Sequence, residues 1–284
     1  MRHQTMKVIT SDNLTETVLD SFSRCTDPRT KEIIISLVRH LHDFAREVAL
    51  THEEWRHGIE FLTATGKRCD GIRQEFILLS DTLGLSSVLD AINQRHEGES
   101  TQSSLLGPFY RDGVKEVEFG ADIARTEGEP AVFHGRVLDG DGKPVPGALI
   151  EVWQTAANGM YEGQDPDQPE GNLRGRFKSN AAGEYAFRSL KPTSYPIPTD
   201  GPVGRMLVAT GRHPMRPAHV HFRIQAQGYE TITTALFSSG DPYVGSDAVF
   251  GVKSSLVVDY VPQEGKEPYF DVERDFVLLA KEQT

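Results

Sequence analysis

The sequence predicts an α+β fold, with an N-terminal helical region followed by an antiparallel β-sandwich. Two observations support it. Apolar residues recur at helical spacing in the first hundred residues, and short β-type runs separated by glycine and proline turns follow from residue 131 onward. Between them lies a linker-like stretch rich in glycine and proline. We therefore predict three parts: a helical region over 1–97, a linker over 98–130 and a β-sandwich over 131–284.

The first predicted helix begins at Pro28, because Asp27 and Pro28 are typical of an N-cap and a first helical position. Downstream apolar residues recur at spacings of three and four, which places them on one helix face. Such a stripe must be buried, either in the core of the same domain or by a partner subunit.

Two more helices are predicted before residue 97. Thr51 and Glu54 have the spacing of a capping box, and the helix that they start is expected to end at Gly66. The next helical stretch is expected over about 70–92, with a break at Gly84.

The β-type runs are short and alternate with turn residues rather than helices, which favours an antiparallel sandwich or barrel. The predicted strands are 131–138, 148–153, 183–187, 220–224, 231–237 and 255–258. The Asp-Gly-Asp-Gly sequence at 139–142 is too short for an EF-hand loop and lacks its terminal Glu, so it predicts a hairpin turn rather than a calcium site.

Composition excludes several classes of protein. The 30 Lys and Arg residues against 41 Asp and Glu give a net charge of −11, which argues against binding nucleic acid. Two cysteines cannot build a disulfide framework or a four-thiolate metal site. The sequence has no secretory signal and no apolar run of the roughly 20 residues that a membrane span requires. We therefore expect a soluble, cytoplasmic protein.

The segment 216–222, Arg-Pro-Ala-His-Val-His-Phe, is the most informative motif. On a strand, His219 and His221 point to the same face, about 6–7 Å apart along the chain, and could bind one metal ion. The other pair spaced by two, His40 and His42, lies in a predicted helix, where this spacing points to different faces.

Two histidines do not complete a metal site, and the residues leave several completions open. Tyr195 is held in extended backbone by the proline that follows it, and Tyr161 follows a predicted strand. A two-histidine, one-carboxylate Fe(II) site is possible on residue types, as is a three-histidine zinc site. The candidate additional ligands for these two alternatives are Asp165, Asp200, Asp241 and His213.

Taken together, these segments resemble the intradiol ring-cleavage dioxygenases, over nearly the whole chain. The resemblance rests on Tyr161, the Tyr195-Pro196 pair, the 216–222 motif and the segments 147–154 and 195–204. It implies non-haem Fe(III) bound by Tyr161, Tyr195, His219 and His221. It also implies that 131–284 is the catalytic domain and that 1–97 forms a homodimer, in whose interface members of the family can hold a lipid.

The resemblance further implies the reaction. A small aromatic diol or triol would chelate the iron. Tyr195 would leave the metal and take a proton from one of the substrate hydroxyls, and O2 would open the ring to a muconate. Arg216 resembles the arginine that stabilises the carbanion-like form of the ring, a role that suits a permanently charged, planar group.

The expected substrate pocket resembles the hydroxyquinol branch of the family more than the catechol branch. Asp81 would accept a hydrogen bond from a third ring hydroxyl. Residues 234–236 replace a segment in which catechol members usually carry Gln. The expected pocket residues are Leu78, Asp81, Leu105, Leu106, Gly107, Pro108, Phe109, Ile197, Pro198 and Val249.

Two alternatives remain. Within the family, catechol or chlorocatechol could be the substrate. In a different class, residues 135–137, 147–148 and 183–185 also resemble non-catalytic transthyretin-like sandwiches that serve as binding or spacer modules. Such a module needs neither a metal ion nor tyrosines positioned to bind one.

Overall fold

The computed structural model describes residues 8–70, 73–94, 96 and 98–282. Contacts between Cα atoms divide the chain into two compact units, 1–64 and 65–284. The first unit contains α1 (Leu14–Ser21), a 3₁₀ turn (Phe22–Arg24), α2 (Pro28–Glu47) and most of α3 (His52–Lys67). The division predicted at residues 97 and 130 stays a prediction.

The capping patterns form as predicted. The carboxylate of Asp27 accepts a hydrogen bond from the backbone N–H of Thr30 at 2.9 Å, with Pro28 as the first residue of α2. In the capping box, the N–H of Glu54 donates to Thr51 Oγ1 at 3.2 Å, and the N–H of Thr51 donates to the Glu54 carboxylate at 2.9 Å. Sequence thus located both helix starts, whereas α1 was missed, although Asn13 and Glu16 have the spacing of an N-cap signal at its start.

The apolar stripe of α2 is not fully covered within its own unit. None of the residues Pro28–Glu47, all of which the structure describes, is buried. Leu37, Leu41 and Phe44 are 50%, 54% and 52% exposed. Within its own unit the stripe is therefore only partly covered, because Ile34 and Val38 are of intermediate exposure, and how the rest of it is buried stays a prediction.

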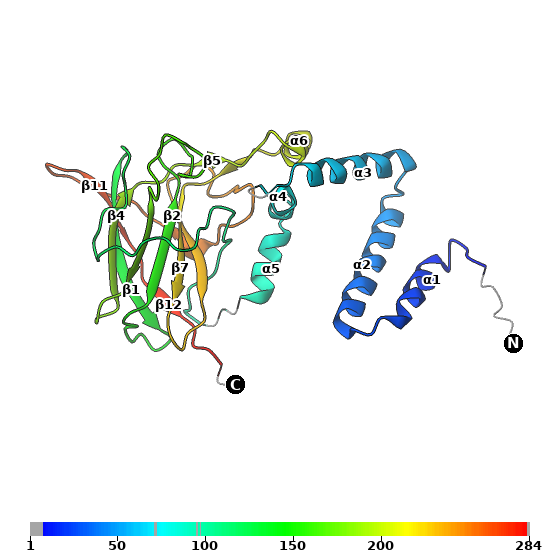
Figure 1. Ribbon diagram of the computed structural model, residues 1–284, viewed down its shortest axis with the longest axis horizontal. Coiled ribbons are helices and arrows are strands. Elements are labelled where there is room, and N and C mark those ends of the chain that lie inside the picture. The colour runs from blue at the N-terminus through cyan, green and yellow to red at the C-terminus, as the bar shows by residue number, and fades with distance from the viewer. Residues whose placement is uncertain (1–7, 71–72, 95, 97, 283–284) are drawn as a thin grey trace. The chain divides into compact units, whose positions relative to one another are not determined.

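The second unit begins with two short helices, α4 (Glu75–Thr82) and α5 (Leu85–Asn93), separated by Gly84 in the left-handed conformation with φ 76°. The predicted break at Gly84 is confirmed, but α4 starts about five residues later than expected. A further helix, α6 (Pro202–Ala209), packs against α4 (Figure 1). Sequence missed α6 because it is short and lies among predicted strands.

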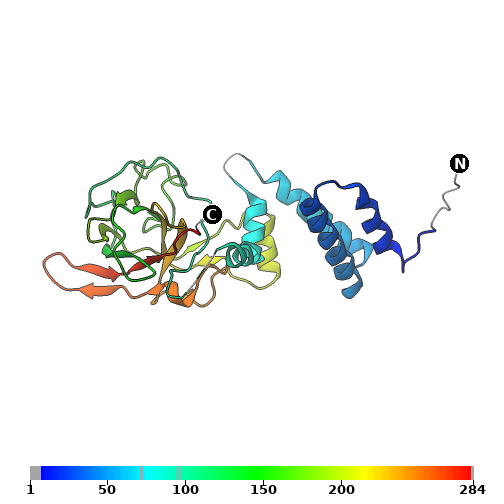
Figure 2. The same cartoon turned by 90° about the horizontal axis from the view of Figure 1, so that it is seen from below.

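Two five-stranded sheets face each other in the β-sandwich (Figure 1). The first contains β1 (Pro130–Asp139), β4 (Glu184–Leu190), β10 (Val261–Gln263), β11 (Tyr269–Glu273) and β12 (Phe276–Leu278). The second contains β2 (Leu149–Gln154), β3 (Arg174–Lys178), β7 (His219–Gln225), β8 (Ile232–Ser238) and β9 (Val257–Val258). A separate pair joins β5 (Tyr195–Pro196) to β6 (Met215–Arg216). The β10–β11 hairpin extends beyond the rest of the sandwich (Figure 2).

Aromatic side chains fill the space between the two sheets. Phe133 and Phe187 of the first sheet stack with ring centroids 4.9 Å apart. Phe222 of β7 contacts Phe187 at 6.0 Å and Phe276 at 4.9 Å across the interface. Because successive residues of a strand point to opposite faces, burying Phe222 in this core turns His221 and His219 to the other face of the sheet.

The predicted α+β class is confirmed, but the sheets are mixed rather than purely antiparallel. Strand β1 pairs antiparallel with β4 and parallel with both β11 and β12, and β8 pairs parallel with β9. Parallel neighbours require a long connection, and here the chain passes through the second sheet before it returns to the edge of β1. Among the described residues, no helix is long and apolar enough to cross a membrane.

Candidate active site

Strand β7 brings the two motif histidines together. The Nε2 atoms of His219 and His221 lie 3.1 Å apart, and each residue is only 2% exposed. The Nδ1 atom of His219 lies 2.7 Å from the carbonyl oxygen of Pro217, which can only accept a hydrogen bond. The proton of a neutral His219 is therefore on Nδ1, and its Nε2 carries a lone pair directed at His221.

Both imidazoles are neutral at pH 7. Burial, with the nearby Arg216 as a second cause, lowers the pKa of His219. Burial and then His219 lower the pKa of His221 well below 6.5. Neutral imidazole nitrogens are the form that binds metal ions, and two such nitrogens 3.1 Å apart favour a proton or cation shared between them.

The two tyrosines reach the same place from different elements. Tyr161 lies in the loop between β2 and β3, and Tyr195 in β5, paired with Arg216 of β6. Their rings make an edge contact with centroids 5.9 Å apart, and the Tyr195 ring lies 5.6 Å from that of His219. Phe109 stacks on Tyr161 at 4.2 Å and fixes its ring.

The Tyr161 phenol is fully buried, and its Oη has no hydrogen-bond partner among the described residues. Burial, and then the neighbouring Tyr195 phenol, raise the pKa of Tyr161 well above 10. An orphaned buried hydroxyl is costly unless a further group satisfies it. A cation that displaces the phenolic proton would do so, because coordination overcomes an unfavourable pKa.

The rings of two tyrosines and two histidines therefore lie together in one buried region, and the phenol oxygens and imidazole nitrogens that they offer fit a hard, oxidised cation. The other ligand sets considered from sequence do not form. No group of three or more His, Cys, Asp or Glu side chains suited to a metal occurs in the part of the chain that the structure describes. That finding removes both the two-histidine, one-carboxylate site and the three-histidine site.

The alternative ligands are engaged elsewhere. Asp165 accepts from Asn158, and Asp200 pairs with Arg68 and Arg73. Asp241 accepts from the N–H groups of Ala218 and Tyr243, and His213 contacts Ser246.

Arg216 borders the same region. Its Nη1 lies 3.3 Å from His219 Nε2, and its Nε and Nη2 donate to the two carboxylate oxygens of Asp247 at 3.2 and 3.3 Å. Burial alone would lower the pKa of Arg216, but Asp247 more than offsets this, so the buried guanidinium remains charged. Sequence reasoning missed Asp247 as its partner, because nothing in the sequence pairs two residues 31 positions apart.

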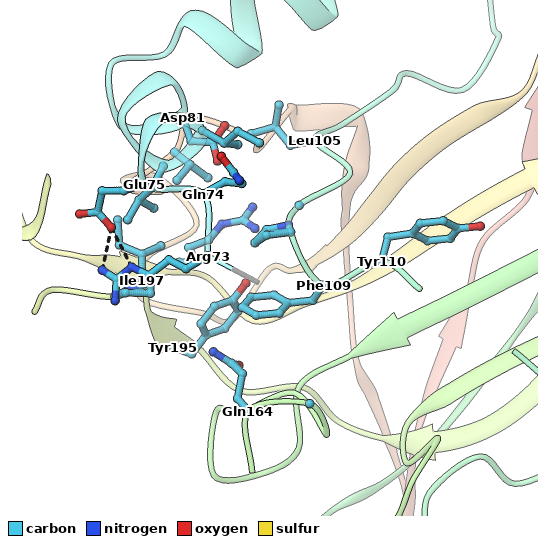
Figure 3. Close-up of a pocket in the computed structure, with 18 of the residues that line it drawn as sticks. Arg73, Gln74, Glu75, Asp81, Leu105, Phe109, Tyr110, Gln164, Tyr195 and Ile197 are labelled. Carbon is cyan, nitrogen blue, oxygen red and sulfur yellow. Dashed lines mark hydrogen bonds and ion pairs between the residues drawn. The ribbon is translucent and has the colours of Figure 1, made fainter. Parts of the chain in front are cut away.

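A cavity of about 370 Å³ opens beside these groups. Asp81 and Leu105 lie on one side of it, and Phe109, Tyr195 and Gln164 on the other (Figure 3). Burial raises the pKa of Asp81, whereas a hydrogen bond from Ser86 lowers it and only partly offsets that effect. The cavity combines apolar walls with a few polar groups, as small-molecule sites do.

Both parts of the chain match dioxygenase profiles. Residues 27–101 match the profile described as "Catechol dioxygenase N terminus", and 106–280 match the one described as "Dioxygenase". A 6-chlorohydroxyquinol 1,2-dioxygenase of Cupriavidus pinatubonensis is 50% identical over 267 residues, covering 94% of this chain and 96% of that protein. The chain belongs to the intradiol ring-cleavage dioxygenase family.

Further relatives agree with this assignment. A hydroxyquinol 1,2-dioxygenase of a Rhizobium species is 46% identical, with 93% of each chain covered. The solved hydroxyquinol 1,2-dioxygenase of Pseudomonas putida DLL-E4 superimposes with a TM-score of 0.92 at 53% identity, covering 95% of this chain and 98% of that one. A catechol 1,2-dioxygenase of Acinetobacter superimposes with a TM-score of 0.81 at 27% identity, covering 96% and 94%. Intradiol dioxygenases use non-haem iron, and the alternative of a non-catalytic sandwich is overturned by membership of this enzyme family.

Nine of the ten residues expected to form the substrate pocket of this dioxygenase line the cavity. They are Leu78, Asp81, Leu105, Gly107, Pro108, Phe109, Ile197, Pro198 and Val249. Leu106 does not line it and is 43% exposed, so its expected place in the pocket is corrected. Neighbouring residues in extended backbone point to opposite sides, and Leu105 takes the inward position. Substrate binding by the nine stays a prediction.

Gly107 places backbone close to the imidazoles. Its φ of 70° is in the left-handed region, and a Cβ there would lie 3.6 Å from His221 Nε2. The dioxygenase cavity is also bordered by residues that sequence reasoning missed, namely Arg73, Glu75, Arg111 and Arg174. Most of their ion-pair partners are distant in the sequence, and the others resemble ordinary surface charges. No local sequence pattern therefore identifies these four residues.

Proposed function

We propose that this dioxygenase cleaves hydroxyquinol between its two adjacent hydroxyl carbons, using O2 and a ferric ion. Both oxygen atoms enter the product, 3-hydroxy-cis,cis-muconate, whose keto form is maleylacetate, a reaction that belongs to aromatic catabolism. The observation that carries the proposal is the convergence of two phenols and two neutral imidazoles beside a cavity of about 370 Å³. The identity of 46–50% to proteins named for hydroxyquinol or its 6-chloro derivative supports the choice of substrate.

Tyr161, Tyr195, His219 and His221 would hold the iron. Ferric iron bound by two phenolates is a hard Lewis acid, which favours the doubly deprotonated diol and makes its ring reactive toward O2. The protein would hold this centre rigidly, because Phe109 and the Trp153 ring stack on Tyr161 and His221, with centroids 4.2 and 4.9 Å apart.

Two residues would manage protons and charge. Tyr195 lines the cavity, so its Oη would accept one of the two protons that the diol loses. Arg216, held by Asp247, would stabilise negative charge that develops on the ring carbon and its oxygen. A lysine could not replace it, because its single ammonium offers neither the planar fork nor a permanently positive charge.

Asp81 would select the triol. Its carboxylate lies across the cavity from Tyr195, where it would accept a hydrogen bond from the third ring hydroxyl (Figure 3). A site with a buried acceptor disfavours an analogue that leaves the acceptor unpaired. Leu78, Leu105 and Val249 provide apolar walls that exclude water around the ring.

Oxygen uptake measured with hydroxyquinol, catechol and a chlorocatechol side by side, with products identified, tests this function. We expect the highest kcat/KM for hydroxyquinol and a product cleaved between the two adjacent hydroxyls. Cleavage outside the diol, or the absence of uptake with all three, would contradict the proposal. Higher kcat/KM for catechol or a chlorocatechol would select the alternative substrates, which similarity to solved catechol and chlorocatechol 1,2-dioxygenases supports at 27% identity.

We also propose a homodimer in which a second copy of the chain covers the apolar stripe of α2. The stripe includes Ile33, Leu37 and Leu41, each at least half exposed in the single chain. A lipid held in that interface is a further expectation of the family. Light scattering gives the mass of the assembly, and extraction followed by mass spectrometry detects a lipid. A monomer at micromolar concentration would contradict the dimer.

A further inference from the structure

Two arginines of the cavity wall share a single buried carboxylate. Glu162, next to Tyr161 in the sequence, accepts from Arg174 Nε at 3.0 Å and from Arg111 Nη1 at 2.6 Å. The side chains of Glu162 and Arg174 are 3% and 4% exposed, whereas that of Arg111 is 53% exposed. The three therefore connect the buried wall of the cavity to its mouth.

The sheet register places this group beside the candidate metal ligands. Arg174 of β3 pairs across the sheet with Trp153 of β2, and Trp153 pairs with His221 of β7. Arg111 follows Phe109 and Tyr110 in the segment that forms another wall. Both arginines line the cavity, and within the described residues the side chain of Arg174 hydrogen-bonds to Glu162.

The charge balance differs between the two sides of the cavity. Arg216 is balanced by Asp247, and Arg73 and Arg68 together by Glu75 and Asp200. Asp81 adds a further carboxylate to that side. On the other wall, two guanidinium groups share only Glu162, which leaves one unit of positive charge in excess. The inner guanidinium, that of Arg174, is only 4% exposed, so its charge interacts more strongly than it would in water.

Substrate and product differ in charge when one enters and the other leaves the cavity. A phenolic substrate in solution is mostly neutral at pH 7, because phenols have a pKa near 10, whereas the ring-opened product carries two ionised carboxylates. A wall with excess positive charge discriminates between the two. Arginine is also well suited to carboxylates, which it binds through two parallel hydrogen bonds.

We propose that Arg111 and Arg174 form a carboxylate subsite that receives one end of the muconate product and directs it to the mouth of the cavity. This inference rests on the proposed function. Arg174 supplies the inner donors, and Arg111 the outer, solvent-exposed ones.

Gly163 keeps the outer arginine in place. A Cβ at residue 163 would collide with the Arg111 guanidinium, so only glycine leaves room for it beside Glu162. The φ of Gly163 is not in the left-handed region, so Gly163→Ala is free of backbone strain and simply displaces a flexible side-chain end. This substitution moves the charge of Arg111 without deleting it.

The test is the dissociation constant of cis,cis-muconate for the iron-loaded enzyme, measured by calorimetry without substrate. Arg111→Ala is expected to weaken binding about tenfold, the effect of losing one charge-assisted hydrogen bond pair. The matched control is Arg136→Ala, which removes an arginine of similar exposure, 54%, from an ion pair with Asp275 outside the cavity. The control is expected to leave the dissociation constant unchanged.

Two further variants separate charge from structure. Gly163→Ala is expected to weaken binding by a smaller factor. Glu162→Gln, which frees both arginines from their shared carboxylate, is expected to tighten it, and added salt should reduce every difference. A merely structural role for Glu162 predicts weaker binding instead. The melting temperature of each variant checks folding.

The inference is overturned if muconate binds to Arg111→Ala within about twofold of wild type, or if Glu162→Gln weakens binding. It is also overturned if Arg111→Ala raises the KM for hydroxyquinol by as large a factor as the muconate dissociation constant, since that indicates a general effect on the cavity. Failure of the proposed function would be seen separately, as absent oxygen uptake. A change of preferred diol would leave a muconate as product and the subsite test intact.

Discussion

Removing the partner of the buried arginine tests the electrostatics of the site. In Asp247→Ala, the Arg216 guanidinium loses two hydrogen bonds, at 3.2 and 3.3 Å, and its counter-charge. The two side chains are only 5% and 2% exposed, so water cannot replace the carboxylate. Breaking such a pair by removing one partner costs about 3–5 kcal/mol.

The effect should be visible as a loss of thermal stability. For a unit such as 65–284, each kcal/mol lowers Tm by about 2–4 °C, so about 3–5 kcal/mol corresponds to roughly 6–20 °C. Differential scanning calorimetry measures this shift. Glu116→Ala is the matched control, because its pair with Lys178 is about half exposed, and such pairs contribute roughly 0–1 kcal/mol.

The pH dependence has a definite sign. Burial alone would raise the pKa of Asp247, but Arg216 more than offsets this and holds it below its usual 3.8. The stabilisation is therefore complete well above pH 3.8 and is lost as pH falls from that value through the folded-state pKa. A drop of less than about 2 °C in Asp247→Ala at pH 7 would refute the reasoning. The double variant Arg216→Met/Asp247→Leu should be more stable than Asp247→Leu alone, because it removes the unpaired charge. No gain in stability would also refute the reasoning.

Three more outcomes are expected. Asp81→Asn should lower kcat/KM for hydroxyquinol about tenfold, since it replaces a charged acceptor by a neutral amide, while catechol is affected less; an unchanged ratio removes Asp81 from substrate selection. Phe187→Ala, a core change between the sheets, should lower the free energy of unfolding in urea by about 3–5 kcal/mol, and a loss under about 1 kcal/mol would contradict the packing described here. Leu105→Ala should raise KM more than Leu106→Ala, because only Leu105 lines the cavity, and equal effects would contradict that assignment.

Local patterns predicted the parts of the fold that depend on local chemistry. Asp27 and the Thr51–Glu54 box marked helix starts because capping involves residues only three apart. The pairing of His219 with His221 on one face followed from the two-residue period of a strand. The parallel pairing of β1 with β11 and β12 could not be foreseen, because no local signal says which edge a returning strand will join.

The same distinction applies to the site. The histidine pair came from spacing. The two tyrosines, 34 residues apart at 161 and 195, were candidates from their local sequence, but their choice as ligands came from the family resemblance, and they meet only through the loop after β2 and the short β5–β6 pair. Asp247 and Glu162 were missed as partners of arginines, because acidic residues are common on protein surfaces. Their burial becomes visible only once the chain is folded. Leu106 was misplaced because a resemblance over a whole segment does not say which of two adjacent side chains points into the cavity.

The central claim is that Tyr161, Tyr195, His219 and His221 hold one ferric ion. The most direct test is the metal content and visible absorption spectrum of the purified protein beside those of Tyr161→Phe and Tyr195→Phe. We predict about one iron per chain at full occupancy and a wine-red colour from tyrosinate-to-iron charge transfer, with a band that shifts or bleaches in each variant. A colourless wild-type protein that still cleaves the ring, or a coloured band unchanged in both variants, would contradict the account.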